Sequence, residues 1–268
     1  MGSLRSRLGG RGVRALGGAW LALTVLSASA CDVALTARAE ARDEWKRSYK
    51  LSKGGTLEIR NTNGQIRVEP AEGDTVEVTA TRIVKAPTEE QAKRTLEDFK
   101  IAETVSPESV LVDSTGLRMA INRSRRVDYM ARVPRGTRVV LKSTNGDIDV
   151  RDLGGMFRAE TTNGGIKARA IEGGAQVETT NGSVDLEFAG LGDDGVRCST
   201  TNGTIALTLP QDVKARFTAT VTNGDISARD LPLATTEKSR RRLEATAGGG
   251  GPLVRLSTTN GDITIRGR

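Results

Sequence analysis

The fold is decided by the stretch at residues 141–150, Leu141-Lys142-Ser143-Thr144-Asn145-Gly146-Asp147-Ile148-Asp149-Val150, because its pattern returns along the chain. Residues 159–168 repeat it as Ala-Glu-Thr-Thr-Asn-Gly-Gly-Ile-Lys-Ala, and residues 177–186 repeat it as Val-Glu-Thr-Thr-Asn-Gly-Ser-Val-Asp-Leu. Such internal repetition is the first signal to follow in a sequence. The tripeptide Thr-Asn-Gly occurs seven times, with its asparagine at Asn63, Asn145, Asn163, Asn181, Asn202, Asn223 and Asn260. From Asn145 onward the period is 18 or 21 residues, and the last gap is 37.

Alignment of the seven copies on asparagine reveals alternation with a period of two. The residues three and five places after each asparagine are apolar, and so are those four and six places before it, as at Ile205, Leu207, Cys198 and Val196. The residues between them are mostly charged or hydroxylated. Because alternation marks strands with one buried face, each repeat is predicted to be a strand, an Asn-Gly corner and a second strand.

Two architectures fit this alternation. Asn-Gly is a strong hairpin signal, so a meander of seven antiparallel hairpins would present the same inward positions. The recurrence of Thr, Asn and Gly at one offset in every copy instead favours stacking, in which asparagine side chains hydrogen-bond along a ladder as in cross-β stacks. We therefore expect an all-β chain, a single parallel β-solenoid (β-helix-like) of about 18–21 residues per rung. In this scheme the seven asparagines form a structural ladder.

The part before the regular repeats is predicted to be less regular but largely β. We expect a β-repeat domain over residues 45–268, with 45–135 less regular and 136–268 forming regular rungs. One short helix is expected after Pro87, because Thr88 and Gln91 form a capping pair and Ala92, Leu96 and Phe99 follow at helical spacing. The helical stripe is expected to pack on the sheet rather than to hold a cofactor.

The N-terminus has the order of an export signal. Arg5, Arg7, Arg11 and Arg14 precede an apolar segment that runs to Ala30 and is followed by Cys31. Residues 1–30 are therefore expected to be a signal peptide, and 31–44 a tether. Since the leader holds four of the 40 basic residues and no acid, residues 31–268 carry 36 basic against 33 acidic residues, and nucleic acid is not expected as a partner.

The residues around Cys31 allow two kinds of processing. Leu26 to Cys31 resembles the lipobox of bacterial lipoproteins, in which the cysteine is acylated, although Ala28 stands where leucine is usual. Ala28-Ser29-Ala30 also satisfies the rule for ordinary signal peptidase, which would give a secreted protein. We expect lipidation at Cys31 and membrane attachment, periplasmic or surface-exposed. The other cysteine, Cys198, falls on an apolar repeat position and implies no disulfide framework.

The chain resembles the putative-adhesin β-repeat family of bacterial envelope proteins, a domain of unknown function that is toast-rack-like. The resemblance rests on residues 57–68, on Val127-Asp128-Tyr129-Met130-Ala131-Arg132-Val133-Pro134-Arg135-Gly136, and on the Thr-Asn-Gly-x-Ile repeats that continue to Ile263. It covers about residues 45–268. It implies a β-solenoid outside the cytoplasm and brings no catalytic residues to this sequence.

The residue types that most catalytic and metal sites need are scarce. No histidine occurs, so Ser-His-Asp and Cys-His catalysis and most zinc sites are excluded. The carboxylate candidates are Asp147, Asp225 and Asp262, each directly after an Asn-Gly, and the pair Asp193-Asp194. Asp147 and Asp225 are expected to lie four rungs, or about 19 Å, apart, which exceeds the spacing of a glycosidase pair. These aspartates are interpreted as polar turn residues, and no cofactor and no metal is expected.

Two further features face outward in this scheme. A threonine precedes every ladder asparagine, which gives a row that is interpreted as stabilising the corner, with a ligand-contact surface as the alternative. The basic run Lys238-Ser239-Arg240-Arg241-Arg242 lies in the long last gap and is interpreted as a solvated excursion, with contact to anionic lipid or acidic glycan as the alternative.

These observations favour a non-enzymatic, exported, lipid-anchored cell-envelope protein that presents a rigid β surface for adhesion, scaffolding or ligand binding. The partner would be an envelope protein or a glycan. The alternatives are a carbohydrate-active β-helix enzyme and an accessory or sensor protein of an envelope-stress system.

Overall fold

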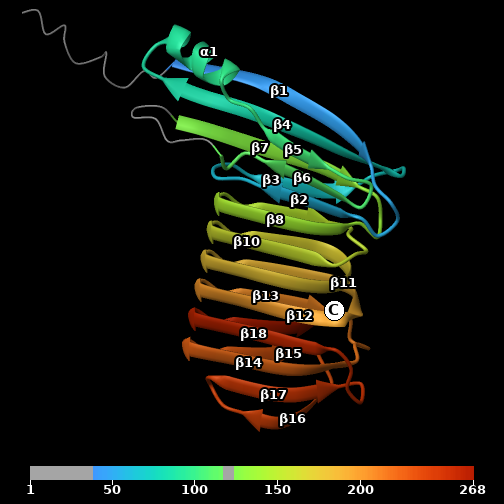
Figure 1. Ribbon diagram of the computed structural model, residues 1–268. Helices are drawn as coiled ribbons and strands as arrows, with labels where there is room; N and C mark the ends of the chain where they lie inside the picture. The colour runs from blue at the N-terminus through green and yellow to red at the C-terminus, as the bar shows by residue number, and fades with distance from the viewer. Residues whose placement is uncertain (1–38, 117–123) are drawn as a thin grey trace, which may run out of the picture. The chain divides into compact units, whose positions relative to one another are not determined.

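The computed structural model describes residues 39–116 and 124–268, and within them the chain is all-β with one short helix, as expected. Figure 1 shows the strands stacked one beside the next. The first half contains β1 (Ala39–Lys50), β2 (Thr56–Arg60), β3 (Ile66–Pro70), β4 (Thr75–Ala86), α1 (Glu89–Glu97), β5 (Ala102–Val105), β6 (Ser109–Asp113), β7 (Ser124–Val133), β8 (Arg138–Asn145) and β9 (Ile148–Arg151). The second half contains β10 (Phe157–Asn163), β11 (Ile166–Asn181), β12 (Val184–Asn202), β13 (Ile205–Leu209), β14 (Ala215–Asn223), β15 (Ile226–Arg229), β16 (Leu233–Lys238), β17 (Arg242–Ala247), β18 (Leu253–Asn260) and β19 (Ile263–Gly267).

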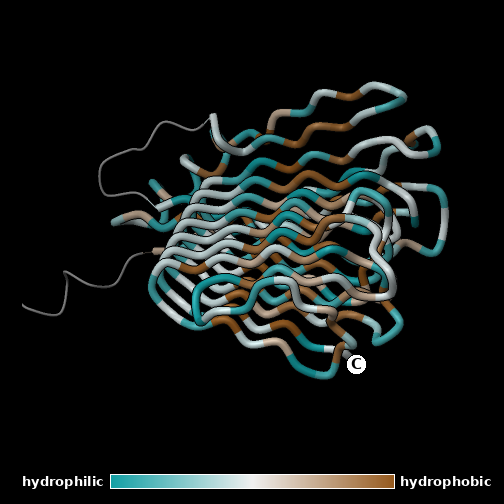
Figure 2. Tube along the Cα trace, turned by 90° about the horizontal axis from the view of Figure 1, so that it is seen from below, coloured by the Kyte–Doolittle hydropathy of each residue, from teal (hydrophilic) through white to brown (hydrophobic). Residues whose placement is uncertain are grey.

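The predicted inward positions of the repeats form the core. All of the apolar positions identified by alternation are buried except Ile226 and Ala228, which are half-buried. Both lie on β15, which pairs on one side only, so no further strand covers them. In Figure 2 the hydrophobic colour recurs at matching places along successive strands, as the alternation requires. Burial of this single core supplies the main driving force for the fold.

Parallel pairing joins the seven repeats in two series. The strands that precede the asparagines pair with one another, and the strands that follow them pair in a second series. Each pairing keeps the repeats in register, so that Asn145, Asn163 and Asn181 are direct partners on neighbouring strands. The long strands β11 and β12 take part in both series, because each runs from one corner to the next.

The order of the repeats in space differs from their order in the chain. The strand β18, which carries Asn260, pairs with β12 on one side and with β14 on the other. Asn260 therefore lies between Asn202 and Asn223, and the last repeat of the chain is inserted between two earlier repeats. The 37-residue gap that precedes Asn260 contains the hairpin β16–β17 and the return of the chain to this inner position.

The sheet as a whole is mixed, whereas a single parallel β-solenoid was expected. β1, β4 and β7 pair antiparallel at one end, and β14, β17 and β16 pair antiparallel at the other. β5 also pairs antiparallel with β6. The alternation of inward and outward side chains is the same for both directions of pairing, which is why the sequence pattern did not separate them.

The helix and the first described strand complete the fold. Thr88 is the N-cap of α1 and accepts a hydrogen bond from the Gln91 backbone N–H at 3.3 Å, as the capping pair predicts. Ala92, Leu96 and Phe99 are buried, and the helix packs on β1 and β4. β1 begins at Ala39, inside the segment that was expected to be a tether. The expected signal peptide and Cys31 lie outside the described residues.

Candidate functional site

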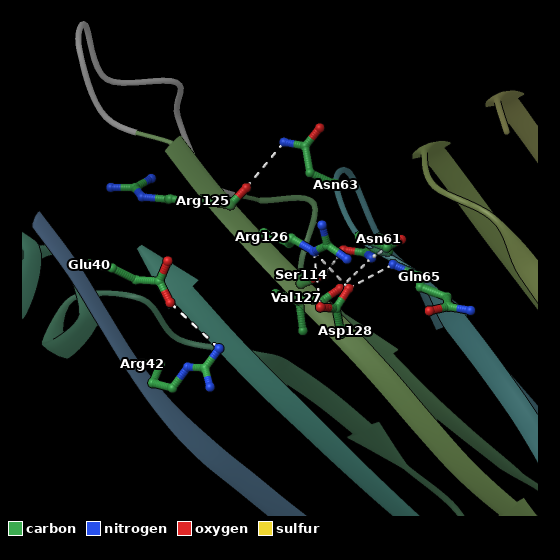
Figure 3. Close-up of polar contacts among 11 residues, drawn as sticks. Glu40, Arg42, Asn61, Asn63, Gln65, Ser114, Arg125, Arg126, Val127 and Asp128 are labelled. Carbon is green, nitrogen blue, oxygen red and sulfur yellow. Dashed lines mark hydrogen bonds and ion pairs between the residues drawn. The ribbon is translucent and has the colours of Figure 1, made fainter. Parts of the chain in front are cut away.

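The corner asparagines form a continuous chain of side-chain hydrogen bonds. Each amide nitrogen donates to the amide oxygen of the neighbouring asparagine at 2.8–2.9 Å. We call these seven residues the asparagine ladder; in spatial order they are Asn63, Asn145, Asn163, Asn181, Asn202, Asn260 and Asn223. At its first end, Asn63 donates to the Arg125 carbonyl oxygen at 3.2 Å (Figure 3). Hydrogen bonds aligned in one direction polarise one another, so the ladder is more than a set of independent contacts.

The glycine after each asparagine is required by the close approach of the stacked corners. A Cβ atom placed on Gly182 would fall inside van der Waals contact with the Gly164 carbonyl oxygen, and the same holds for the other repeats. Several of these glycines, Gly146 and Gly182 among them, do not have the positive φ that would itself favour glycine. The Asn-Gly pair therefore serves stacking, and its resemblance to a hairpin signal is incidental.

A second row of hydrogen bonds runs inside the corner, two residues before four of the seven asparagines. Thr161, Thr179, Thr200 and Thr258 are buried, and each hydroxyl donates to the corner glycine carbonyl of the preceding repeat at 3.0–3.2 Å. Since a buried hydroxyl without a partner is costly, these bonds fix the register of neighbouring repeats. This inner row was missed from the sequence, although the recurrence of a hydroxylated residue at a position otherwise inward could have indicated it.

The first corner, at Asn63, forms comparable hydrogen bonds, but its neighbouring strand is β7 (Figure 3). Asn61 takes the place of the inner threonine, is 3% exposed, and donates to the Val127 carbonyl oxygen at 2.9 Å and to the Gly64 carbonyl oxygen at 3.1 Å. The Ser114 hydroxyl lies 3.0 Å from the Asn61 amide oxygen. Asp128 accepts a hydrogen bond from the Gln65 backbone N–H at 2.9 Å. The larger amide of Asn61 thus reaches β7, which carries no Asn-Gly corner of its own.

The threonine row beside the asparagine ladder faces solvent. Its members follow the spatial order Thr62, Thr144, Thr162, Thr180, Thr201, Thr259 and Thr222. All except the half-buried Thr62 are exposed, and no hydroxyl of the row hydrogen-bonds to another described residue. The row and the asparagine ladder together form a regular polar edge, with about 4.8 Å between repeats.

The carboxylate candidates are placed differently from the expected arrangement. Insertion of the Asn260 repeat puts Asp262 directly beside Asp225, and it moves Asp147 and Asp225 one repeat further apart than expected. Asp262 accepts the Asp225 backbone N–H at 2.8 Å, as Asp147 accepts that of Gly165 at 2.7 Å. The hydrogen bond from Arg240 lowers the pKa of the Asp225 carboxyl group, whereas a glycosidase acid needs a raised pKa. Asp262 therefore caps a backbone N–H group and Asp225 pairs with an arginine, an arrangement unlike an acid–base pair.

The basic run at 238–242 is exposed to solvent, as expected, and it lies at the turn of a hairpin. It is the turn of β16–β17, and its backbone crosses the last corner, where the Arg240 and Arg241 carbonyl oxygens accept the N–H groups of Ile226 and Val221 at 2.9 and 3.0 Å. Arg240 forms a two-point ion pair with Asp225 at 2.8 and 3.0 Å. Arg242 likewise pairs with Glu237 and Glu244, so two of the four basic side chains of this run are paired within the protein.

Cys198 lies on β12, is 1% exposed, and has a free thiol whose pKa is raised by burial. In residues 39–116 and 124–268, no group of three or more His, Cys, Asp or Glu side chains is placed to hold a metal ion. The same residues contain no helix of the length and apolar character needed to cross a membrane.

Comparison with known proteins gives one family and several distant structures. Residues 135–266 match the family model described as Toastrack DUF4097. A putative cell adhesion protein from Clostridium sporogenes has 12% identity and a TM-score of 0.47, over 85% of this chain and 100% of that one. Putative adhesins from Bacteroides fragilis and Parabacteroides distasonis have 11% and 10% identity and TM-scores of 0.39 and 0.33, each over 84% of this chain and 97% of its own. No curated protein matches the chain.

Proposed function

We propose that this chain, whose residues 135–266 match the Toastrack DUF4097 family model, is a non-enzymatic protein of the bacterial cell envelope. In this proposal the paired repeats form a parallel β-solenoid that is closed at both ends by antiparallel strands. The protein is exported and anchored through acylated Cys31, and it presents the polar edge of the solenoid to an envelope protein or a glycan.

The observation that carries the proposal is the asparagine ladder with the free threonine row beside it. The ladder uses its amides within the protein, so it holds neighbouring repeats at one spacing. The threonine hydroxyls remain available, because no described residue uses them. A rigid element that carries unused hydrogen-bonding groups loses little entropy on binding, which is what a binding surface requires.

Substitution within the threonine row tests the surface. Thr162, Thr180 and Thr201 are changed together to valine, which keeps the shape of each side chain and removes its hydroxyl. The full chain, expressed in a bacterial envelope and purified, is used to capture partners from envelope extract. We expect the triple variant to lose the species that the wild type retains, while the matched variant Thr208→Val with Thr264→Val, on β13 and β19, retains them. Equal capture by both variants would remove the threonine row from the proposal.

Cell fractionation of a Cys31→Ser variant tests the anchor separately. We expect the substitution to move the protein from the membrane fraction to the soluble fraction, since a serine cannot be acylated in this way. Membrane association that persists unchanged would contradict lipid anchoring. It would not bear on the proposal that the threonine row is a binding surface.

A further inference from the structure

Two arginines face each other on neighbouring strands without any acidic partner. Arg197 on β12 and Arg255 on β18 are register partners, and both side chains are exposed. Neither guanidinium forms a hydrogen bond or an ion pair with another described residue. Like charges placed directly opposite on adjacent strands destabilise a sheet, so this pair costs the free protein stability.

The insertion of the last repeat is what brings these arginines together. Arg197 and Arg255 belong to repeats that are 58 residues apart in the chain, with the Asn223 repeat between them in sequence. Both repeats carry the same outward pattern, arginine, serine and threonine at alternate positions. Arg197, Ser199 and Thr201 therefore lie beside their counterparts in the inserted repeat, Arg255, Ser257 and Thr259. The result is a patch of two guanidinium groups and four hydroxyl groups with no acid among the six.

A hollow lies at the edge of this patch and contains both polar and apolar surface. Its lining includes both arginines together with Met156, Gln176, Asp194 and Leu253. Leu253 is 36% exposed and is one of two large hydrophobic side chains exposed in the described part of the chain. Asp194 is the one acid in the lining, so the hollow has a net positive charge.

We propose that this hollow binds the phosphate group of an anionic lipid. A guanidinium has N–H donors spaced to bind two phosphate oxygens at once. Two guanidinium groups on adjacent strands can therefore donate hydrogen bonds to the same phosphate. The apolar surface of Leu253 and Met156 suits the glycerol and acyl part of the same molecule, which a free phosphate lacks. Bound phosphate would also offset the repulsion between Arg197 and Arg255. The inference goes beyond the proposed function, since it needs neither the Cys31 anchor nor the threonine row.

A second arginine pair supplies a matched control on the other series of strands. Arg229 and Arg266 are also register partners without an ion pair to another described residue. The hollow beside Arg266 is lined by Asp185 and does not include Arg229. Replacement of this pair changes the net charge by the same amount and leaves the proposed site intact.

Calorimetric titration of the purified full-length protein with dihexanoyl phosphatidylglycerol, kept below its micelle concentration, tests the site. We expect Arg197→Gln with Arg255→Gln to weaken binding by about tenfold or more, because two charge-assisted contacts are lost. Asp194→Asn should tighten binding, since it removes the repelling carboxylate. Arg229→Gln with Arg266→Gln should change the affinity by less than about twofold, because neither arginine lines the hollow and exposed charges are screened by salt.

Urea unfolding of the same variants shows whether lost binding reflects lost structure. We expect Arg197→Gln with Arg255→Gln to be at least as stable as the wild type, because the cross-strand repulsion is removed. Absence of lipid binding by the wild type, or equal weakening by the two double variants, would overturn the proposal. Inorganic phosphate that binds as tightly as the lipid would overturn the lipid as its source.

Discussion

At the scale of single residues, the corner asparagines contribute their amides and not an unusual backbone conformation. Among described residues other than glycine, positive φ occurs only at Asp152, Ala170 and Asp230, so no ladder asparagine needs it. Asn181 donates to Asn163 and accepts from Asn202, at 2.9 and 2.8 Å. Its side chain therefore joins three repeats.

This placement predicts that Asn181→Gly and Asn181→Ala both destabilise the protein. Each variant loses two hydrogen bonds, at about 0.5–1.5 kcal/mol per bond, and glycine gains nothing because the backbone is not in the left-handed region. Urea denaturation of the full chain measures the loss. Thr180→Ala, at the exposed neighbouring position, is the control and should stay within about 0.5 kcal/mol of wild type. A glycine variant as stable as wild type would mean that the ladder contributes nothing.

The corner glycines lead to a second prediction at this scale. Gly182→Ala places a methyl group against the Gly164 carbonyl oxygen, and the stacked backbone cannot move aside without breaking the register. We expect a loss of about 1–3 kcal/mol or more, as for overpacked cores. Gly190→Ala on β12 is the control, since nothing lies within 4 Å of its Cβ position. Thermal melts that show similar losses at both positions would contradict the stacking explanation.

At the scale of elements, the spatial order of the last two repeats can be tested by cross-linking. Thr201 and Thr259 lie on adjacent strands, about 4.8 Å apart, whereas Thr201 and Thr222 are separated by about twice that distance. A disulfide needs Cα atoms within about 7 Å. In a Cys31→Ser background, the pair Thr201→Cys with Thr259→Cys should therefore oxidise readily.

The control for this test is the pair that chain order would make adjacent. Thr201→Cys with Thr222→Cys should remain reduced under the same mild oxidant, as judged by mobility on non-reducing gels. If the second pair forms the disulfide and the first does not, the Asn260 repeat is not inserted where the structure places it.

The elements also show which parts of the fold the sequence predicts. Alternation at positions such as Ile205 and Leu207 predicts the inward faces well, because burial depends on the face of the strand and not on its neighbours. The insertion of the Asn260 repeat is invisible to this pattern, since either order gives the same inward residues. Antiparallel closure by β1 and β17 is hidden for the same reason. The asparagine ladder can be predicted from the repeat in the sequence. The Arg197–Arg255 patch cannot, because it exists only through the insertion of the Asn260 repeat.

At the scale of the whole molecule, the repeats form a nearly one-dimensional stack in which each stabilises its neighbours. The ends of such a stack open more easily than the middle, and closing elements protect them. At one end the Tyr49 hydroxyl donates to the Glu103 carboxylate at 2.6 Å and thereby joins β1 to β5. At the other, β17 pairs with β14 and extends one series of strands beyond the last corner. The middle of the stack is therefore expected to open last.

Cys198 makes this expectation measurable, because it is a natural thiol on β12 in the inner part of the stack. Thiol reagents attack through the thiolate, and burial both raises the pKa of the Cys198 thiol and blocks access to it. In a Cys31→Ser chain, modification by a thiol reagent should therefore be slow and should require opening of the middle repeats. Asn181→Gly should accelerate it about tenfold for each 1.4 kcal/mol of stability lost, since the reaction then samples a larger open population. A cysteine introduced at the exposed Thr180 should react at once and serves as the control. Fast modification of Cys198 in a chain that resists urea would show that the middle repeats open independently of global unfolding, contrary to a stack stabilised by its neighbours.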